Sequence, residues 1–409
     1  MPRGPVPEMG RSLKRCGPLA IVVALSAQSN LAQSSESGLP VEVAVPSAPI
    51  AVRGAGASHL FYELHLTNFR NAPIELTRVV VLAGDDTSAV LASYAGEDIT
   101  SRLLRPGTSP TLPDKQVIAG GMRAILMLQV TLPGNRPLPM QLSHRLTFSP
   151  TIPNAAPVEE TMNLPRVSVG GQRPLVIEPP LRGGDWLAAN GPSNTSVHRR
   201  ALLIVDGVPR IAQRLAIDWL KLGPGGRLAH DDRSRNENWF AYGEEVLSIA
   251  DGTVIATKDG IPENVPMTDK RAVPITLDTL GGNLVVLYIG NGRYATYAHL
   301  IPKSLRVSAG AKVRRGQVLG LLGNSGNSDA PHLHFHIHDG PSPFGSEGVP
   351  FIFESMQFRG SVASLDKLIA DSPGSRRVAR WCGRGRSRWR TRSFDSLERP
   401  RPVPRTGPT

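Results

Sequence analysis

The sequence is poor in cysteine and in aromatic residues, and it has no long hydrophobic run. Its 409 residues include two cysteines, Cys16 and Cys382, which lie outside the candidate folded regions, so no structural disulfide is expected. A membrane-spanning helix needs roughly 18 or more consecutive apolar residues, and no segment reaches that length. Aromatic residues make up 5% of the chain, whereas 41 glycines and 37 prolines favour short strands joined by turns.

Acidic residues are outnumbered by basic ones, but the imbalance is local. The formal net charge is +12, and the segment from Ser372 to Thr409 holds +9 of it, from eleven arginines against Asp395 and Glu398. This Arg-rich tail, residues 373–409, lacks apolar periodicity and is expected to be disordered. The first expectation is a solvated tail without function. The alternative is a tail that binds anionic wall polymers or lipid surfaces on an exported protein, with no nucleic acid expected.

The first 32 residues have the pattern of an export signal. Arg11, Lys14 and Arg15 precede the apolar stretch of residues 19–25, and small residues follow, so a signal peptide over residues 1–32 is predicted. The apolar stretch is too short to span a bilayer. We therefore expect a bacterial protein that is periplasmic or secreted, with an uncleaved signal anchor as the alternative.

Residues 39–166 are predicted to form an all-β domain. Runs rich in strand formers at 60–67, 74–82 and 122–131 are separated by turn residues, a spacing typical of an immunoglobulin-like sandwich. No motif in this domain carries chemistry, so a spacer or adaptor role is expected. A Pro-rich linker region is predicted over residues 150–180.

A second β-rich domain, punctuated by glycine, is predicted over residues 174–358. Asp206-Gly207 predicts one hairpin turn, and Asp251-Gly252 predicts a second within residues 246–256. Gly290-Asn-Gly292 predicts a third between the apolar runs 284–289 and 294–300. The predicted fold class is therefore all-β: an N-terminal immunoglobulin-like sandwich followed by a domain of antiparallel, glycine-rich hairpins.

Four histidines alternate with apolar residues in the run Pro331-His-Leu-His-Phe-His-Ile-His338. In a strand this alternation places all four imidazoles on one face and the apolar residues on the other, core-facing side. An unpaired buried polar group costs about 1–3 kcal/mol, and imidazole is a common metal ligand. The run therefore indicates a metal site, with a solvated face as the alternative.

Further motifs surround this run in a fixed order. They are Tyr297-Ala-His299-Leu300, the spaced glycines of residues 307–320, Gly323-Asn-Ser-Gly-Asn-Ser328 and Pro331-His-Leu-His-Phe335. The ordered set resembles the lysostaphin-type zinc metallopeptidases, bacterial cell-wall endopeptidases built from glycine-rich β-hairpins. The resemblance covers roughly residues 197–353. The glycine spacing also resembles lipoyl carrier domains, but Lys312 lacks the flanking pattern of a modifiable lysine.

The resemblance implies one zinc ion, two of its ligands and two catalytic histidines. Asp218 and His334 match two metal ligands of the family, and His299 and His332 match its two catalytic histidines. Two nitrogen ligands and one oxygen ligand leave a coordination position open for water, which is the arrangement of a hydrolytic zinc site.

One position departs from the family pattern. Arg214 stands four residues before Asp218, where the family has its third ligand, a histidine, and a guanidinium has no lone pair to offer. His198 is the leading candidate for the missing ligand. The predicted hairpin at Asp206-Gly207 would place it opposite Leu215, or opposite Ala216 on the face of Asp218 if the strand has a one-residue bulge.

His198 is not the sole candidate for this role. His230 or His336 could also supply the third ligand, whereas an ion pair between Arg214 and Asp218 would leave the site without metal. The sequence thus predicts an exported zinc metalloendopeptidase that hydrolyses peptide cross-links of peptidoglycan. The alternative is a metal-free relative that binds the cell wall or activates a hydrolase.

Overall fold

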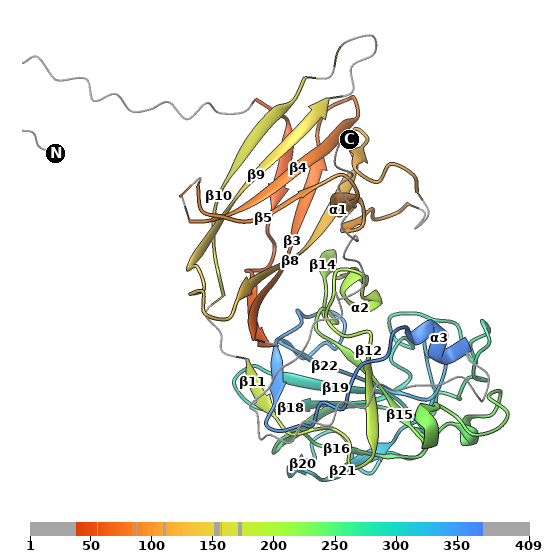
Figure 1. Cartoon of the computed structure of the whole chain (residues 1–409). Coiled ribbons are helices and arrows are strands. Elements are labelled where there is room, and N and C mark those ends of the chain that lie inside the picture. Colours follow the sequence, from red (N-terminus) through yellow and green to blue (C-terminus); the bar gives the residue numbers. More distant parts are fainter. Residues whose placement is uncertain are drawn as a thin grey trace, which may run out of the picture. The chain divides into compact units, whose positions relative to one another are not determined.

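The computed structural model describes residues 38–370, except 55, 85, 87, 109–111, 151–155, 157 and 171–173. The predicted signal peptide and the Arg-rich tail lie outside the described residues. Strands dominate, and the predicted all-β class is confirmed (Figure 1). The α-helices among the described residues are α1 (Glu97–Thr100), α2 (Val197–Arg200) and α3 (Leu365–Ala370). In this part of the chain no helix has the length and apolar character needed to cross a membrane.

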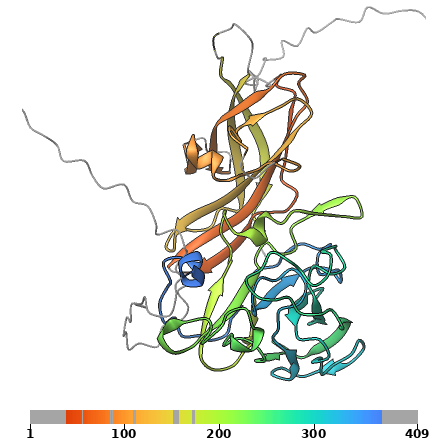
Figure 2. The same ribbon diagram turned by 90° about the vertical axis from the view of Figure 1, so that its right-hand side faces the viewer.

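The N-terminal strands form two sheets. The first has the order β1 (Val41–Ala44), β3 (Ala57–Asn68), β8 (Arg123–Pro133) and β6 (Leu103–Leu104), with β2 (Ile50–Gly54) also paired to β3. The second has the order β10 (Glu160–Ser168), β9 (Gln141–Pro150), β4 (Ile74–Ala83) and β5 (Val90–Ala95), with β7 (Val117–Ile118) paired to β4. Figure 1 labels the longer of these strands, β3, β4, β5, β8, β9 and β10, and Figure 2 shows the same sheets turned by 90°.

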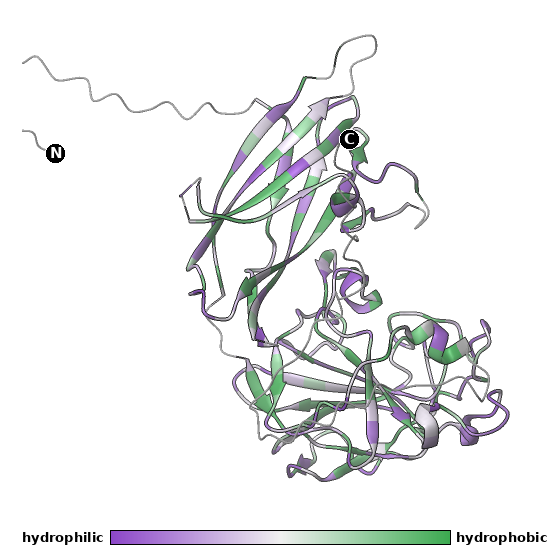
Figure 3. Cartoon of the chain, in the orientation of Figure 1, coloured by the Kyte–Doolittle hydropathy of each residue, from purple (hydrophilic) through white to green (hydrophobic). Residues whose placement is uncertain are grey.

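Alternation along these strands explains how the two sheets pack. Buried and less buried residues alternate in parts of β4 and β9. Figure 3 shows bands of hydrophobic and hydrophilic residues along the strands of the sandwich. Their inward side chains meet those of β3 and β8 in one core, which includes Leu64, Leu126, Val79 and Leu146. A two-sheet sandwich is therefore observed, whereas its immunoglobulin-like topology stays a prediction.

Part of the segment expected to be a linker is a strand. Residues 160–168 form β10, which pairs antiparallel with β9 although it contains Pro165. The register shifts between Leu164 and Val167, and β10 is an edge strand. Proline has no backbone N–H to donate, and at such a position the sheet tolerates it because no inner hydrogen bond is lost. Proline content alone was therefore a poor guide to this boundary.

The C-terminal region is centred on one seven-stranded sheet. Its order is β12 (Asp185–Ala189), β15 (Ile217–Leu222), β22 (Leu333–His338), β19 (Tyr294–Leu300), β18 (Asn283–Tyr288), β17 (Gly252–Lys258) and β20 (Lys312–Val313). Around it, β11 (Leu175–Ile177) pairs with β23 (Phe351–Phe353), β13 (Leu203–Val205) with β14 (Val208–Arg210), and β16 (Glu245–Leu247) with β21 (Val318–Leu321).

Two of the three predicted hairpins of this region are confirmed. The third, around Asp251-Gly252, was wrong, because β16 pairs with β21 whereas β17 pairs with β18 and β20. Asp206 and Gly207 have φ of 50° and 77° and join β13 to β14 as a two-residue turn with positive φ at both positions. Gly290, Asn291 and Gly292 also have positive φ and join β18 to β19. The turn at Gly290-Asn-Gly292 places the Tyr-Ala-His-Leu strand, β19, beside β18, and β19 pairs on its other side with β22.

The alternation expected for the histidine run is confirmed as well. Leu333, Phe335 and Ile337 of β22 lie in the hydrophobic core under the sheet. The opposite face of β22 therefore carries the histidines, and β22 lies between β15 and β19, from which further polar side chains reach that face.

Candidate metal centre

Asp218 of β15 and His334 of β22 are cross-strand partners, and this pairing brings the first two side chains of the site together. Cross-strand partners share a face of the sheet, and their neighbours Trp219 and Phe335 lie in the core on the other face. Both Asp218 and His334 are buried, and Nδ1 of His334 lies 3.0 Å from Oδ1 of Asp218.

His198 reaches the same carboxylate from α2. Its Nε2 lies 3.2 Å from Oδ2 of Asp218, and its ring centroid lies 4.6 Å from that of His334. Among the described residues, His198, Asp218 and His334 form a group whose candidate ligand atoms all lie within 4.8 Å of one another. The structure thus places these three predicted side chains together.

The route by which His198 arrives differs from the expected one. The pairs of β13 and β14 have the register expected for a two-residue turn, but the ladder ends at Leu203 and Arg210. His198 therefore has no cross-strand partner at Leu215 or Ala216, and the expected continuation of the hairpin was wrong. The chain turns after Arg210, with backbone bonds from Arg214 to Ile211 and from Ala216 to Gln213, and the partner strand of β15 is β12.

His299 depends on a bulge for its orientation. Ala298 pairs with His334, so strict alternation would send the next side chain to the core face. The register between β18 and β19 shifts here, and His299 has a φ of 66°, which a residue other than glycine seldom adopts. The imidazole of His299 therefore lies 4.8 Å from the His332 ring and 5.8 Å from the His334 ring, centroid to centroid.

Backbone carbonyls fix the proton positions on three of these rings. Nδ1 of His198 lies 3.1 Å from the Asn190 carbonyl oxygen, Nδ1 of His299 lies 2.8 Å from that of Ser325, and Nδ1 of His332 lies 2.8 Å from that of Ala330. A carbonyl oxygen only accepts, so each Nδ1 donates. In the neutral form of each ring, Nε2 then carries a lone pair.

A relay through His336 fixes the proton on His334. Nε2 of His336 lies 2.9 Å from the Pro343 carbonyl oxygen and must donate to it. Burial holds the pKa of His336 well below its ordinary value, so the ring is neutral and its Nδ1 accepts a hydrogen bond from Nε2 of His334, 3.0 Å away. Burial also lowers the pKa of His334 to about 4, which leaves a lone pair on its Nδ1.

These hydrogen bonds aim nitrogen lone pairs at an ionised carboxylate. Burial alone would raise the pKa of Asp218, but the neighbouring His332 and His198 outweigh it and hold that pKa well below its usual range. The lone pair on Nδ1 of His334 therefore faces Oδ1 of Asp218 at 3.0 Å, and a His198 that binds a metal through Nε2 would present a second lone pair 3.2 Å from Oδ2. Such acceptor pairs repel unless a cation lies between them.

The donor set suits zinc. Imidazole nitrogen and carboxylate oxygen are common ligands of Zn²⁺ at about 2.0–2.2 Å, and tetrahedral ligands at that radius lie roughly 3.3 Å apart. The 3.0 and 3.2 Å separations are close to this value. Three protein ligands would leave the fourth tetrahedral position open, as in catalytic rather than structural zinc sites.

His299 and His332 stand beside this group with opposite proton affinities. Burial, and then the neighbouring His332 and His334, lower the pKa of His299 well below its usual value, so this ring is neutral. Burial also opposes the charged form of His332, but Asp218, 3.4 Å from its Nε2, raises the pKa of His332 overall. One ring can therefore accept a proton while the other can donate one.

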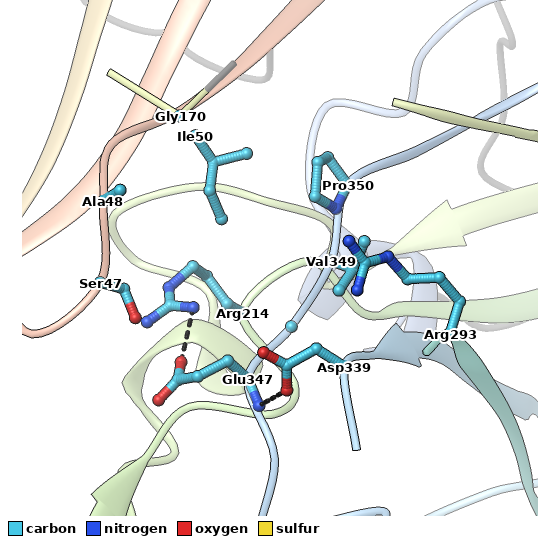
Figure 4. A pocket seen from close by; sticks show the side chains of 11 residues that line it. Ser47, Ala48, Ile50, Gly170, Arg214, Arg293, Asp339, Glu347, Val349 and Pro350 are labelled. Atoms are coloured by element: carbon cyan, nitrogen blue, oxygen red, sulfur yellow. Dashed lines mark hydrogen bonds and ion pairs between the residues drawn. The ribbon is translucent and has the colours of Figure 1, made fainter. Parts of the chain in front are cut away.

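Arg214 points away from the site. Its guanidinium pairs with Glu63 of β3 at 2.9 Å and with Glu347 at 2.7 Å, so the alternative ion pair with Asp218 is not formed. Figure 4 shows Arg214 and Glu347 in the wall of a cavity of about 190 Å³ that is also lined by Ser47, Ile50 and Arg293. The residue that departs from the family pattern, Arg214, thus takes part in structural ion pairs.

The remaining candidates for the third ligand have other partners. His230 is bonded to the exposed Asp231 and lies outside the group of three, and His336 serves in the relay. His338 bonds to Thr296 and to the Gly340 carbonyl oxygen, so the last histidine of the run is a satisfied buried residue.

Two residues at the site escaped prediction from the sequence. Asn190 accepts the hydrogen bond from His198 with its carbonyl and donates from Nδ2 to Oδ2 of Asp218 at 2.8 Å. It has a φ of 51° and precedes Gly191-Pro192, a turn signal that marks its backbone but not its partner. The second residue is Glu63, for which the sequence gives no signal.

The buried His and Asp side chains on this face of the sheet are a group that could hold a metal ion. The model of peptidase family M23 matches residues 239–345, and this region is an M23 peptidase domain. The match includes His299, His332 and His334, whereas His198 and Asp218 precede it.

Two known proteins are similar to this chain over part of its length. Peptidoglycan DD-endopeptidase ShyA of Vibrio cholerae is 45% identical over 96 residues, 22% of this chain and 22% of that protein. An uncharacterized metalloprotease of Haemophilus influenzae is 39% identical over 93 residues, 22% of this chain and 17% of that protein. The chain therefore spans about a fifth of the length of the curated relatives it matches.

Among solved structures, the catalytic domain of the antimicrobial peptidase lysostaphin from Staphylococcus simulans is similar to this chain. It shares 19% sequence identity with a TM-score of 0.22, over 40% of this chain and 88% of that chain.

Proposed function

We propose that this protein is an exported zinc metalloendopeptidase that hydrolyses peptide cross-links of peptidoglycan. The observation that carries the proposal is the convergence of His198, Asp218 and His334, with their candidate ligand atoms within 4.8 Å. The M23 match supports peptidase chemistry, and the similarity to a relative named as a peptidoglycan DD-endopeptidase supports the substrate. In this proposal residues 174–358 are the catalytic domain and residues 39–166 an accessory domain.

The proposal assigns roles to five side chains. His198 Nε2, His334 Nδ1 and an oxygen of Asp218 hold the zinc ion. When bound, zinc polarises an amide carbonyl and lowers the pKa of water to about 7. Asn190 and the His336 relay orient the ligands, because each fixes which nitrogen or oxygen keeps its lone pair.

The two other histidines handle protons. His299 is neutral and its Nδ1 donates to Ser325, so Nε2 is free to accept a proton from the attacking water. His332, whose raised pKa favours the charged ring, donates from Nε2 to the carbonyl oxygen as it gains charge or to the departing amine. The carbonyl of Ala330 holds the His332 ring in place for this transfer.

The test is digestion of purified peptidoglycan by the zinc-loaded protein, with the soluble products separated and identified by mass. Release of peptides cut at cross-links, abolished in His299→Ala, supports the proposal. A protein that binds peptidoglycan but releases nothing, and that takes up no zinc, would instead be the metal-free wall-binding relative.

A further inference from the structure

Two arginines converge on one buried carboxylate of the sandwich. Oε1 of Glu63 lies 3.1 Å from Nε of Arg199, and its Oε2 lies 2.9 Å from Nη2 of Arg214. The side chains of Glu63, Arg199 and Arg214 are 2%, 0% and 3% exposed. Burial alone would raise the pKa of Glu63, but the charges of Arg214 and Arg199 outweigh it and lower that pKa, so Glu63 is ionised.

Arg199 is the residue directly after His198. Both belong to α2, which has four residues, and a helix this short has almost no stability of its own. The position of α2 therefore depends on contacts with its surroundings. Those of Arg199 are extensive: its Nη2 donates to the carbonyl oxygens of Tyr62 and Leu128, each at 2.8 Å, in addition to the pair with Glu63.

The rest of α2 is attached to the same sandwich. Arg200, the last residue of the helix, donates from Nη1 to the Leu103 carbonyl oxygen at 3.1 Å. On the outer face of β8, Ile125 and Met127 pack with Ile211, and Leu202 packs against this cluster. Glu63 is the cross-strand partner of Met127, so the carboxylate lies within this contact surface.

The other two candidate ligands do not depend on these contacts. Asp218 and His334 lie in adjacent strands of the C-terminal sheet, and each strand is paired on both sides. His198 alone is carried by an element that the sandwich holds in place. A change at Glu63 should therefore affect one ligand of the three.

We propose that Glu63 is a positioning residue of the metal centre: through Arg199 it holds α2 so that His198 completes the zinc site. Arg214, in the position where the family has its ligand histidine, is the second cation bound by the same carboxylate. The accessory sandwich thus contributes to the metal centre by positioning one of its ligands. This inference rests on the proposed function, because it takes His198 to be a zinc ligand.

The experiment is a double-mutant cycle on zinc affinity with the full chain. Affinity is measured by competition with a chromophoric chelator for the parent, Glu63→Gln, His198→Ala and the double variant. We expect Glu63→Gln to weaken zinc binding about 10- to 100-fold, the range seen when an outer residue that orients a ligand is lost. We expect the double variant to bind no more weakly than His198→Ala, because both changes remove the same ligand.

A matched control separates positioning from general loss of stability. Glu347→Gln breaks the other ion pair of Arg214 but leaves the Glu63–Arg199 pair intact. It should keep zinc affinity within about threefold of the parent. Circular dichroism and thermal unfolding of each zinc-free variant establish that affinities are compared between folded proteins.

A second variant covers the case in which Glu63→Gln does not fold. Arg199→Lys keeps a positive charge beside Glu63, but one ammonium cannot reproduce the planar set of bonds to Glu63, Tyr62 and Leu128. It should also weaken zinc binding, and only when His198 is present.

The outcomes distinguish the inference from the proposed function. If His198→Ala binds zinc as tightly as the parent, the proposed site itself is wrong. If His198→Ala loses zinc while Glu63→Gln and Arg199→Lys bind it normally, or lose affinity equally in the His198→Ala background, only the positioning role of Glu63 is overturned.

Discussion

Oδ2 of Asp218 and Nε2 of His198 lie 3.2 Å apart, although one residue belongs to a central strand and the other to a single helical turn. The hydrogen bond of His198 Nδ1 to the Asn190 carbonyl leaves Nε2 facing the carboxylate. Arg214, at the position where the resemblance implies a ligand histidine, pairs with Glu63 and Glu347 instead. The departure at Arg214 therefore does not by itself remove a metal centre from this chain.

The first prediction separates zinc binding from catalysis. His299→Ala and His332→Ala should retain zinc but lose roughly 10²- to 10⁴-fold in hydrolysis, the usual contribution of a positioned acid or base. His334→Ala should lose both zinc and activity, because it removes a ligand. Zinc content and initial rates of peptidoglycan digestion, measured on the same preparations, check this. Full activity in His332→Ala would contradict the assigned mechanism.

The second prediction concerns the relay through His336. In His336→Phe nothing accepts the hydrogen bond from His334 Nε2, so the ring is free to move its proton to Nδ1 and zinc affinity should fall about 10- to 100-fold. His336→Gln keeps an acceptor oxygen in the side chain and should restore part of the affinity. Chelator competition measures both variants, and equal affinities in His336→Phe and the parent would show that the relay is dispensable.

Prediction from the sequence succeeded where structure is local. Alternation placed Leu333, Phe335 and Ile337 in the core, and two turn motifs gave two hairpins that the structure contains. It failed on the path of His198, because a predicted register assumes that a strand continues, whereas the chain turns after Arg210. The bulge at His299 has no sequence signal of its own.

Contacts between distant segments account for the rest of what was missed. Glu63 lies 136 residues before Arg199 and 151 before Arg214, and no local pattern connects them. Burying these three charges costs desolvation energy, which is offset only because the charges meet in the folded protein. In the sequence, Arg214 indicated only that a ligand histidine was missing, because its pairing with Glu63 depends on the fold.

The third prediction is a pH dependence of stability that arises in the sandwich core. Burial lowers the pKa of His144 from 6.5 to about 4, and the ring accepts or donates one bond to the Tyr62 hydroxyl. The unfolded chain binds a proton on His144 more readily than the folded protein does. The contribution of the neutral ring to the free energy of unfolding is therefore fully present above pH 6.5. It is lost as the pH falls through 6.5 towards 4, by at most about 3 kcal/mol.

His144→Gln tests this directly, because glutamine keeps a polar partner for Tyr62 and does not titrate. Urea unfolding of the parent and variant at pH 7 and at pH 4.5 gives the two free-energy differences. The parent should lose more stability on acidification than the variant. Equal losses in both proteins would mean that His144 is not the group responsible.

The measurement that bears most directly on the central claim is the zinc content of the purified protein, by atomic emission after dialysis against metal-free buffer, compared with His198→Ala. We predict one zinc ion per chain in the parent and a loss of affinity of more than about 100-fold in the variant, since removal of a ligand exceeds the effect of removing an outer residue. His230→Ala, at an exposed histidine outside the group of three, should keep its zinc. A parent without zinc even after reconstitution, or a His198→Ala variant that retains it fully, would contradict the account.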